Sequence, residues 1–360
     1  MNAVLHFYLF CLVIVCATTT PSLDDLWSGN AFFSSYANLT VDSPGFEDVD
    51  AGTRVVVINA TWYLFGREDS GATAECPDGI ILINVRASLD QGLTWGAYSI
   101  VAAPDQISTC IYADGSAFYD TDTDTWHYLS QVLAVGNVGG WQLSHFTCLG
   151  PSPFGTWQPD EHNPVVHSGQ LFNQICAGTG KHCELGMIDE GTPQIVEKLD
   201  GDFYVTFHGY DYNRKQAARG VARTPDFFTW YVTGGAGNLP GDVIFSALDC
   251  NTWNVPWSGG CIGSGEASIV RAPSNYMYQV IEAADQQLGC ETGIDTQWWP
   301  LGLVRSQIWS PSPQWEQMQS TPFVGGPVGN EPQTGCRYVA HSFLLPNTHQ
   351  AYPVSYLFLF

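Results

Sequence analysis

The chain has 360 residues, of which 45% are hydrophobic and 13% aromatic, with 13 tryptophans among them. Only 12 Lys and Arg side chains stand against 35 Asp and Glu, so the formal net charge is −23. This charge repels nucleic acids and anionic membranes, and we expect neither as a partner. The hydrophobic content is too high for a disordered chain.

The N-terminal residues are typical of a secretory signal peptide. The first 20 residues carry no charged side chain, and an apolar run extends from Val4 to Ala17. The run is short for a membrane span, and a short membrane anchor is the less favoured alternative. We therefore expect a signal peptide over residues 1–20, one mature domain over residues 21–360, and a secreted, extracellular protein.

The cysteines fit an oxidising compartment. Eleven are present, two of them in the expected signal peptide, and the odd number left predicts disulfides and one unpaired thiol. The short loops favour the bridges Cys176–Cys183 and Cys250–Cys261. None of the cysteines has the C-x-x-C spacing of a zinc site. The sequons at Asn38 and Asn59 permit glycosylation of an exported chain.

Short alternating runs separated by Gly, Pro, Asn and Asp dominate the sequence, and helical periodicity is nearly absent. Four stretches share one order of acid, small residue, apolar strand, turn and aromatic strand. They begin at Asp50, Asp114, Glu190 and Glu266. A second recurring element follows each stretch, for example VARTPDFFTWYV after the third.

The first of these second elements contains the octapeptide SLDQGLTW, residues 88–95, which matches the pattern S-x-D-x-G-x-T-W. This pattern is the Asp-box, a turn in which the Asp and Ser side chains bind backbone groups and the Trp packs beneath. It indicates a propeller blade and says little about chemistry. We therefore interpret Asp90 as structural.

Strand-rich repeats at this spacing predict an all-β fold, a five-bladed β-propeller that forms a single domain. A fifth copy, CRYVAHSFLLP from Cys336, is incomplete, so the N-terminal stretch NAFFSSYANLTV is expected to complete that blade. Six blades remain an alternative if residues 234–262 contain a degenerate blade.

The acids at the start of successive repeats are the candidate catalytic residues. In a propeller the innermost strand of each blade lines the axial channel, so Asp50, Asp114 and Glu190 are expected to meet at one mouth. Like charges brought together cost stability, which function can require. Hydrolysis of a glycosidic bond needs one carboxylic acid and a second carboxylate. The alternative is that these acids only cap strands in an acidic protein.

Two motifs carry a resemblance to a known family. Glu190-Gly191-Thr192-Pro193 and the stretch DGSAFYD from Asp114 resemble motifs of the five-bladed glycoside hydrolases of family 43 and their relatives, and the repeats extend the resemblance over roughly residues 45–345. Thr192 is an additional residue before the proline, and Ala51 stands where the family has proline, so Asp48 is an alternative to Asp50.

The resemblance implies a role for each acid. Asp50 would be the general base, Asp114 would orient Glu190 and keep it protonated, and Glu190 would be the general acid. Such an enzyme inverts the anomeric configuration, with carboxyl groups about 6.5–9.5 Å apart. The implied substrate is an arabinose- or xylose-containing polysaccharide or oligosaccharide, and the protein is expected to be a monomer.

Further residues are candidates for substrate binding. GSGEASIV, residues 263–270, resembles a blade-four motif of the family, but Glu266 stands where the family has His. This departure argues against the family's ion site, although a structural calcium ion in the channel stays open; no metal or other cofactor is required. His341 and Arg337 are candidate replacements, and Trp298-Trp299 are candidates for the floor of a sugar subsite.

Two alternative functions remain. The Asp-box and EGTPQIVEKLDG also resemble blades of sialidases, in which Asp78 would be the acid/base, Glu190 would activate a tyrosine, and three arginines would hold the substrate carboxylate. The candidate arginines for that role are Arg54, Arg67, Arg219, Arg223, Arg271 and Arg337. A carbohydrate-binding propeller without catalysis is the third possibility.

Overall fold

The computed structural model describes residues 22–28, 30, 54–77, 79–90, 92, 94–135, 140–172, 188–211, 216–232, 243–246, 264–283, 301–307, 309, 316–317, 342–345 and 356–359. Nearly all of these residues lie in strands or in the turns between strands, as the short alternating runs of the sequence predict. The expected signal peptide, residues 1–20, lies outside them.

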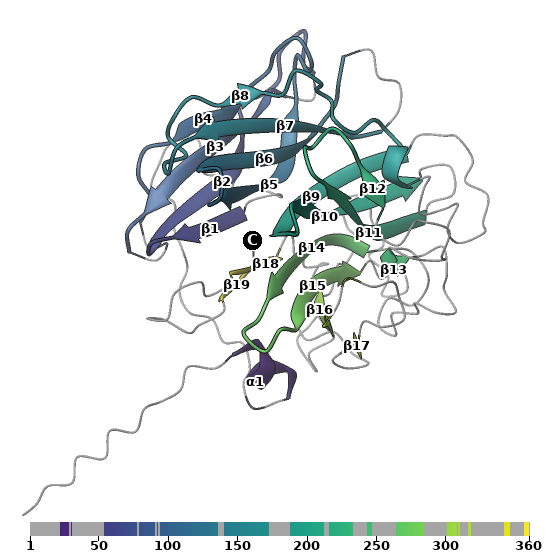
Figure 1. Ribbon diagram of the computed structural model, residues 1–360. Helices are drawn as coiled ribbons and strands as arrows, with labels where there is room; N and C mark the ends of the chain where they lie inside the picture. The colour runs from purple at the N-terminus through teal and green to yellow at the C-terminus, as the bar shows by residue number, and fades with distance from the viewer. Residues whose placement is uncertain are drawn as a thin grey trace, which may run out of the picture.

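Four antiparallel sheets account for most of the strands (Figure 1). Blade one contains β1 (Arg54–Ile58), β2 (Thr61–Asp69), β3 (Ile81–Ser88) and β4 (Ser99–Ala102). Blade two contains β5 (Tyr112–Asp120), β6 (Thr125–Val132), β7 (Gln142–Leu149) and β8 (Gln158–Pro159). Blade three contains β9 (Ile188–Leu199), β10 (Asp202–Asp211), β11 (Gln216–Thr224), β12 (Tyr231–Val232) and β13 (Val243–Ser246). Blade four contains β14 (Ser264–Arg271), β15 (Met277–Ala283), β16 (Leu301–Ser306) and β17 (Glu316–Gln317).

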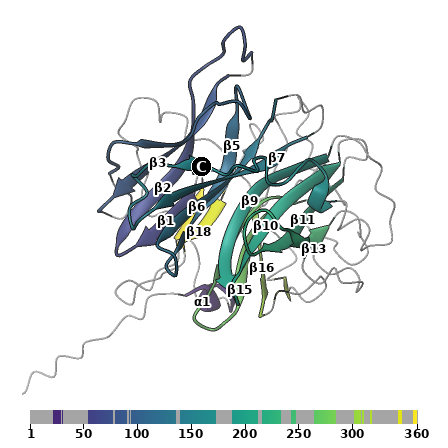
Figure 2. The same ribbon diagram turned by 45° about the horizontal axis from the view of Figure 1, so that its top comes forward.

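The sheets are arranged around a common centre, and the first strand of each blade lies nearest to it (Figures 1 and 2). Neighbouring first strands are in contact, β1 with β5, β5 with β9, and β9 with β14. In each blade the strands follow one another in chain order, apart from β13, which pairs with β11. The architecture is therefore an all-β propeller, as predicted.

The predicted number of five blades is wrong for the described part of the chain, which contains four. The incomplete fifth copy supplies β18 (Ser342–Leu345), which pairs with β19 (Tyr356–Leu359) in a two-stranded sheet. β18 contacts both β1 and β14, so this hairpin lies between blade four and blade one. The N-terminal stretch that was expected to complete the fifth blade lies outside the described residues. Of residues 234–262, in which the six-blade alternative placed a degenerate blade, only β13 is described, and it pairs with β11 of blade three.

The short helix α1 (Leu23–Trp27) docks on blade four. Ser22 caps it, and the Ser22 hydroxyl accepts a hydrogen bond from the Asp25 amide at 3.1 Å. The Asp24 carboxylate accepts hydrogen bonds from the hydroxyls of Ser274 and Tyr278, at 2.9 and 2.5 Å. No helix in the ranges given above is long and apolar enough to cross a membrane.

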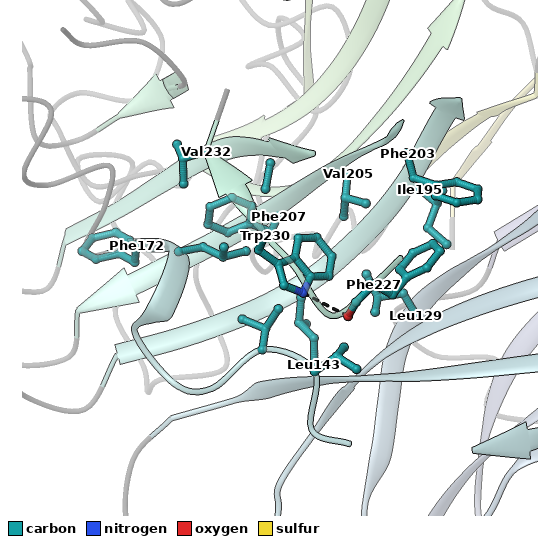
Figure 3. Packing of buried hydrophobic residues seen from close by; sticks show 14 residues of the cluster. Leu129, Leu143, Phe172, Ile195, Phe203, Val205, Phe207, Phe227, Trp230 and Val232 are labelled. Atoms are coloured by element: carbon teal, nitrogen blue, oxygen red, sulfur yellow. Dashed lines mark hydrogen bonds between the residues drawn. The ribbon is translucent and has the colours of Figure 1, made fainter. Parts of the chain in front are cut away.

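An apolar core fills the space between blades two and three (Figure 3). Leu129 and Leu143 come from blade two, and Val205 and Phe207 come from blade three. Phe172, from the segment that joins the two blades, completes the contact. Burial of each such side chain contributes about 1.5–3 kcal/mol, so this core fixes the position of blade three against blade two.

The Asp-box turn forms as predicted. The Asp90 carboxylate accepts hydrogen bonds from the Thr94 amide at 2.8 Å and the Thr94 hydroxyl at 2.6 Å, and Ser88 Oγ accepts one from the Gly92 amide at 2.8 Å. The bonds from Thr94, with a further one from Ser88, lower the pKa of Asp90 to about 2. Gly92 has a φ of +85° and faces the Trp62 ring, so a side chain there would be strained. Asp90 is confirmed as structural.

A second turn of this kind, shorter by one residue, follows β11. The Asp226 carboxylate accepts hydrogen bonds from the amides of Phe228 and Thr229, at 2.9 and 2.6 Å. The Trp230 indole donates to the Phe227 carbonyl at 3.1 Å, as the dashed line in Figure 3 marks. The sequence pattern did not identify this turn because it lacks the glycine.

A buried histidine, His145, and a partly buried one, His127, lie where blade two meets blade three. His127 Nδ1 and His145 Nε2 are 3.0 Å apart, and His145 Nδ1 lies 3.2 Å from Asp160 Oδ2. The His145 ring stacks on Phe227 at 4.0 Å between centroids. Burial, together with the neighbouring His145, lowers the pKa of His127 to about 3, and burial also lowers the pKa of His145.

This pair makes the blade interface sensitive to acid. An unfolded histidine takes up a proton near pH 6.5, whereas folded His127 does so only near pH 3. Stability is therefore present above pH 6.5 and decreases as the pH falls from 6.5 towards 3, by up to about 1.4 kcal/mol per pH unit for one proton. We expect His127→Phe, which cannot titrate, to show a smaller loss of melting temperature between pH 6.5 and pH 4 than the wild type. The exposed His167→Gln is the control, and equal slopes for His127→Phe and wild type would refute the expectation.

Candidate active site

The candidate acids begin the inner strands in one register. Asp114 is the third residue of β5, Glu190 the third of β9, and Glu266 the third of β14. The ends at which these strands begin define one mouth of the propeller, called the mouth from here on. Asp50 precedes β1 and lies outside the described residues, as does its alternative Asp48.

Asp114 is buried and faces two donors. The residue is 6% exposed. Oδ2 accepts a hydrogen bond from Gln131 Nε2 at 2.9 Å, and Oδ1 lies 3.6 Å from Arg67 Nη1. Both carboxylate oxygens are thus directed at donor groups, and this arrangement holds the Asp114 carboxylate in one orientation.

Glu190 has no exposed surface. Its Oε1 accepts hydrogen bonds from two consecutive backbone amides, those of Leu171 and Phe172, each at 2.8 Å. Its own amide donates to the Trp141 carbonyl at 2.9 Å. The side chain therefore lies beneath the segment that joins blades two and three, with one oxygen fixed as an acceptor.

A glycine allows that segment to come close. Gly209 pairs with Glu190 across the β9–β10 ladder, and Phe172 packs directly on it. A Cβ at Gly209 would lie 2.1 Å from Phe172 Cδ2 and 3.1 Å from Phe172 Cβ. Because the contact includes Phe172 Cβ, rotation of the ring does not relieve it, and the backbone of Phe172 would have to move.

We expect Gly209→Ala to weaken the hydrogen bonds that the Leu171 and Phe172 amides donate to Glu190. Overpacking of this kind costs about 1–3 kcal/mol of unfolding free energy. The measurement is chemical denaturation together with amide hydrogen exchange at Phe172, which should become faster. Gly96→Ala is the control, because a Cβ there meets only the Ala87 carbonyl at 3.5 Å. Equal stability of the two variants would count against close packing of Phe172 on Gly209.

A bulge in β9, just after Glu190, contacts the same glutamine that binds Asp114. Between the pairs Thr206–Gln194 and His208–Gly191 the register shifts by one residue, so Thr192 and Pro193 oppose a single residue of β10. Thr192 has a φ of +39°, and its amide donates to Gln131 Oε1 at 2.8 Å. Gln131 therefore contacts Asp114 through one end of its amide and the strand after Glu190 through the other.

Tyr128 lies next to Asp114 and is fully buried. Burial, and then the charge of Asp114, raise the pKa of its hydroxyl far above the ordinary value, while the charge of Arg54 opposes the rise.

Two of the described arginines of the sialidase alternative lie away from the mouth. Arg271 pairs with Glu197 at 2.5 Å and Arg223 pairs with Asp202 at 2.5 Å, both at the end of the propeller opposite the mouth. Arg67 contacts Asp114, and Arg54 is 5% exposed. Neither the side chain of Arg219 nor Arg337 is among the described groups. The described arginines therefore do not assemble into a three-arginine site.

A disulfide bond joins two segments of the chain at the mouth. Cys76, in the loop between β2 and β3, bonds to Cys110, just before β5, with a Cα–Cα distance of 5.5 Å. The sequence analysis did not predict this bridge, and the two bridges that it favoured lie outside the described residues. Cys148 is buried and unpaired, in accord with the expected free thiol.

We expect the double variant Cys76→Ser, Cys110→Ser to lose stability. The bridge spans 34 residues, for which the loop-entropy estimate is about 3–4 kcal/mol. Thermal unfolding of the purified variant measures the loss, and Cys148→Ser changes a cysteine without breaking this bridge. A melting temperature equal to that of the wild type would contradict a structural role for the bridge.

Several predicted site residues fall outside the described part of the chain. They are Trp298, Trp299, Arg337, His341 and the sialidase candidate Asp78. Glu266 is placed by its backbone in β14 only. Among the described residues no group of three or more His, Cys, Asp or Glu could hold a metal ion.

The sequence analysis missed the groups that hold the two acids. Gln131 lies near the end of β6, TWHYLSQV, where other polar residues also occur, so the sequence did not single it out. The amides of Leu171 and Phe172 gave no signal, because backbone donors are independent of the side chain. Arg67 was considered only for the sialidase alternative.

No protein-family model matches the sequence, and no curated protein matches it either. Among solved structures, a glycosyl hydrolase from Bacteroides ovatus is similar, with a TM-score of 0.54 and 14% identity over 86% of this chain and 80% of that chain. An exo-β-1,3-galactanase from Clostridium thermocellum has a TM-score of 0.52 and 12% identity over 86% of this chain and 54% of that chain.

A third similar structure comes from work on a family of mannoside phosphorylases that contains glycoside hydrolases targeting β-1,2-mannosidic linkages. Its TM-score is 0.51 at 13% identity, over 82% of this chain and 76% of that chain. At these identities the likeness concerns the fold. The chain thus has the all-β propeller fold that glycoside hydrolases also use.

Proposed function

We propose that the protein is a glycoside hydrolase whose reaction depends on Asp114 and Glu190. The observation that carries the proposal is that both acids begin inner strands at one mouth, where Gln131 joins Asp114 to the Thr192 amide, two residues after Glu190, in a fold shared with glycoside hydrolases. A strand cap needs no such connection, since water satisfies an exposed carboxylate.

The contacts suggest a division of roles. Because Glu190 Oε1 accepts two backbone amides, a proton on this side chain would sit on Oε2 and would pass from there to the glycosidic oxygen. The negative charge of Asp114 would favour the protonated form of Glu190. Asp50 would deprotonate the attacking water on the opposite face of the sugar, with inversion of the anomeric carbon.

The substrate class follows from the motifs and from the similar structures. The resemblance of the Asp114 and Glu190 motifs favours arabinose- or xylose-containing saccharides. The similar structures include an exo-β-1,3-galactanase and one from a family with hydrolases of β-1,2-mannosidic linkages, so a screen should include galactosides and mannosides. The Cys76–Cys110 bridge supports secretion into an oxidising compartment, where the protein would act as a monomer.

The decisive variant is Glu190→Gln. Its Oε1 can still accept the amides of Leu171 and Phe172, so the fold is retained and only the proton donor is lost. We expect kcat on an aryl glycoside with a poor leaving group to fall about 10³-fold, and on a dinitrophenyl glycoside to fall much less, because a good leaving group needs little protonation. Steady-state rates of the wild type and the variant on both substrates measure this difference.

An equal fall for both leaving groups would refute the acid role of Glu190. If wild type and variant bind a saccharide equally well and neither turns over any glycoside of the screen, the non-catalytic binding protein is the correct function. Retained configuration in the first product, measured by NMR, would contradict inversion.

A further inference from the structure

We propose that Gln131 is a positioning residue of this reaction, one that fixes the Asp114 carboxylate relative to the strand carrying Glu190. The inference rests on the proposed function. It concerns a residue that donates no proton to the substrate but that joins two blades at the point where their acids begin.

The orientation of the Gln131 amide is determined by its partners. The Thr192 amide can only donate, so the atom that it contacts at 2.8 Å must be the carbonyl oxygen Oε1. The NH₂ group then faces Asp114 and donates to Oδ2 at 2.9 Å. Asp114 thus accepts a hydrogen bond at Oδ2, while its Oδ1 forms an ion-pair contact with Arg67 Nη1 at 3.6 Å.

The additional residue of the Glu190 motif makes this contact possible. Without Thr192 the motif would read Glu-Gly-Pro, and proline has no amide hydrogen to donate. The extra residue forms the bulge in β9 and redirects its amide sideways, away from the β10 ladder and into blade two. The Gln131 contact therefore depends on the additional residue Thr192 and on the bulge that this residue forms in β9.

Burial makes the contact costly to lose. Gln131 is 6% exposed, and Gly191 lies so close that a Cβ there would be 2.7 Å from Gln131 Oε1. Removal of the Gln131 side-chain amide takes one hydrogen-bond partner away from Asp114 Oδ2 and one from the Thr192 backbone amide, and both groups lie in a closed space. The expected consequence is a displaced Asp114 and a slower chemical step, with substrate affinity little changed.

The test compares Gln131→Leu with Gln131→Glu on the glycoside that the wild type hydrolyses best. Leu has no hydrogen-bonding group, so kcat should fall on the order of 100-fold at every pH with KM within about twofold. A protonated Glu reproduces both hydrogen bonds, its O–H donating to Asp114 and its carbonyl accepting from Thr192. Gln131→Glu should thus keep kcat within about tenfold of wild type at low pH and lose it as the pH rises and the shared proton dissociates.

Gln194→Leu is the matched control. Gln194 joins blades three and four in the same manner, with Nε2 donating to the Ile269 carbonyl at 2.9 Å and Oε1 accepting from the Ile269 amide at 2.8 Å. This substitution removes the same two kinds of hydrogen bond between blades but touches neither acid. Its kcat should stay within about twofold of wild type even if its melting temperature falls.

These measurements distinguish the positioning role of Gln131 from the proposed hydrolase function. Equal losses of kcat for Gln131→Leu and Gln194→Leu, or a Gln131→Glu variant that follows Gln131→Leu at every pH, would overturn the positioning role while the proposed function stands. Absence of turnover by the wild type overturns both. Amide exchange at Thr192, expected to be faster in Gln131→Leu, tests the contact itself without any substrate.

Discussion

The inner strands of a propeller are not joined to one another by a ladder of backbone hydrogen bonds, so side chains must set the distance between blades. Between blades two and three this task falls to an apolar core with a few buried polar bridges at its edge. Gln131 is one bridge, and Ser116 Oγ, which accepts from the Ile195 amide at 2.7 Å, is another. The relative placement of Asp114 and Glu190 depends on these contacts, because each acid lies on a different blade.

The two ends of the propeller use different interactions. At the mouth, the acids are buried and held by amide donors and, for Asp114, also by Arg67, which keep a fixed geometry in a closed environment. At the opposite end, half-exposed ion pairs such as Arg271–Glu197 and the Asp-box turns join strands near solvent, where each pair contributes little on its own. A scaffold of this kind separates the contacts that hold the blades together from the groups at the mouth.

The sequence was informative where a pattern reports directly on geometry. Period-two alternation identified the strands, the Asp-box identified a turn at Asp90, and the shared offset placed Asp114 and Glu190 in one register. The described residues contain four blades instead of the predicted five, because there the fifth copy contributes only a hairpin, β18 with β19. The contacts of Glu190 with the amides of Leu171 and Phe172 could not be predicted, since they arise from the path of the backbone. The Cys76–Cys110 pairing likewise depends on which loops meet at the mouth.

The proposed hydrolysis requires the acids of neighbouring blades to act on one glycosidic bond. The most direct measurement is a crystal structure of Glu190→Gln with an uncleaved oligosaccharide. The account predicts the nitrogen that replaces Oε2 within hydrogen-bond distance of the glycosidic oxygen, about 2.6–3.2 Å, with Asp114 adjacent and Asp50 facing a water on the opposite side of the ring. A saccharide bound away from the mouth, with residue 190 still covered by the segment between blades two and three, would contradict it.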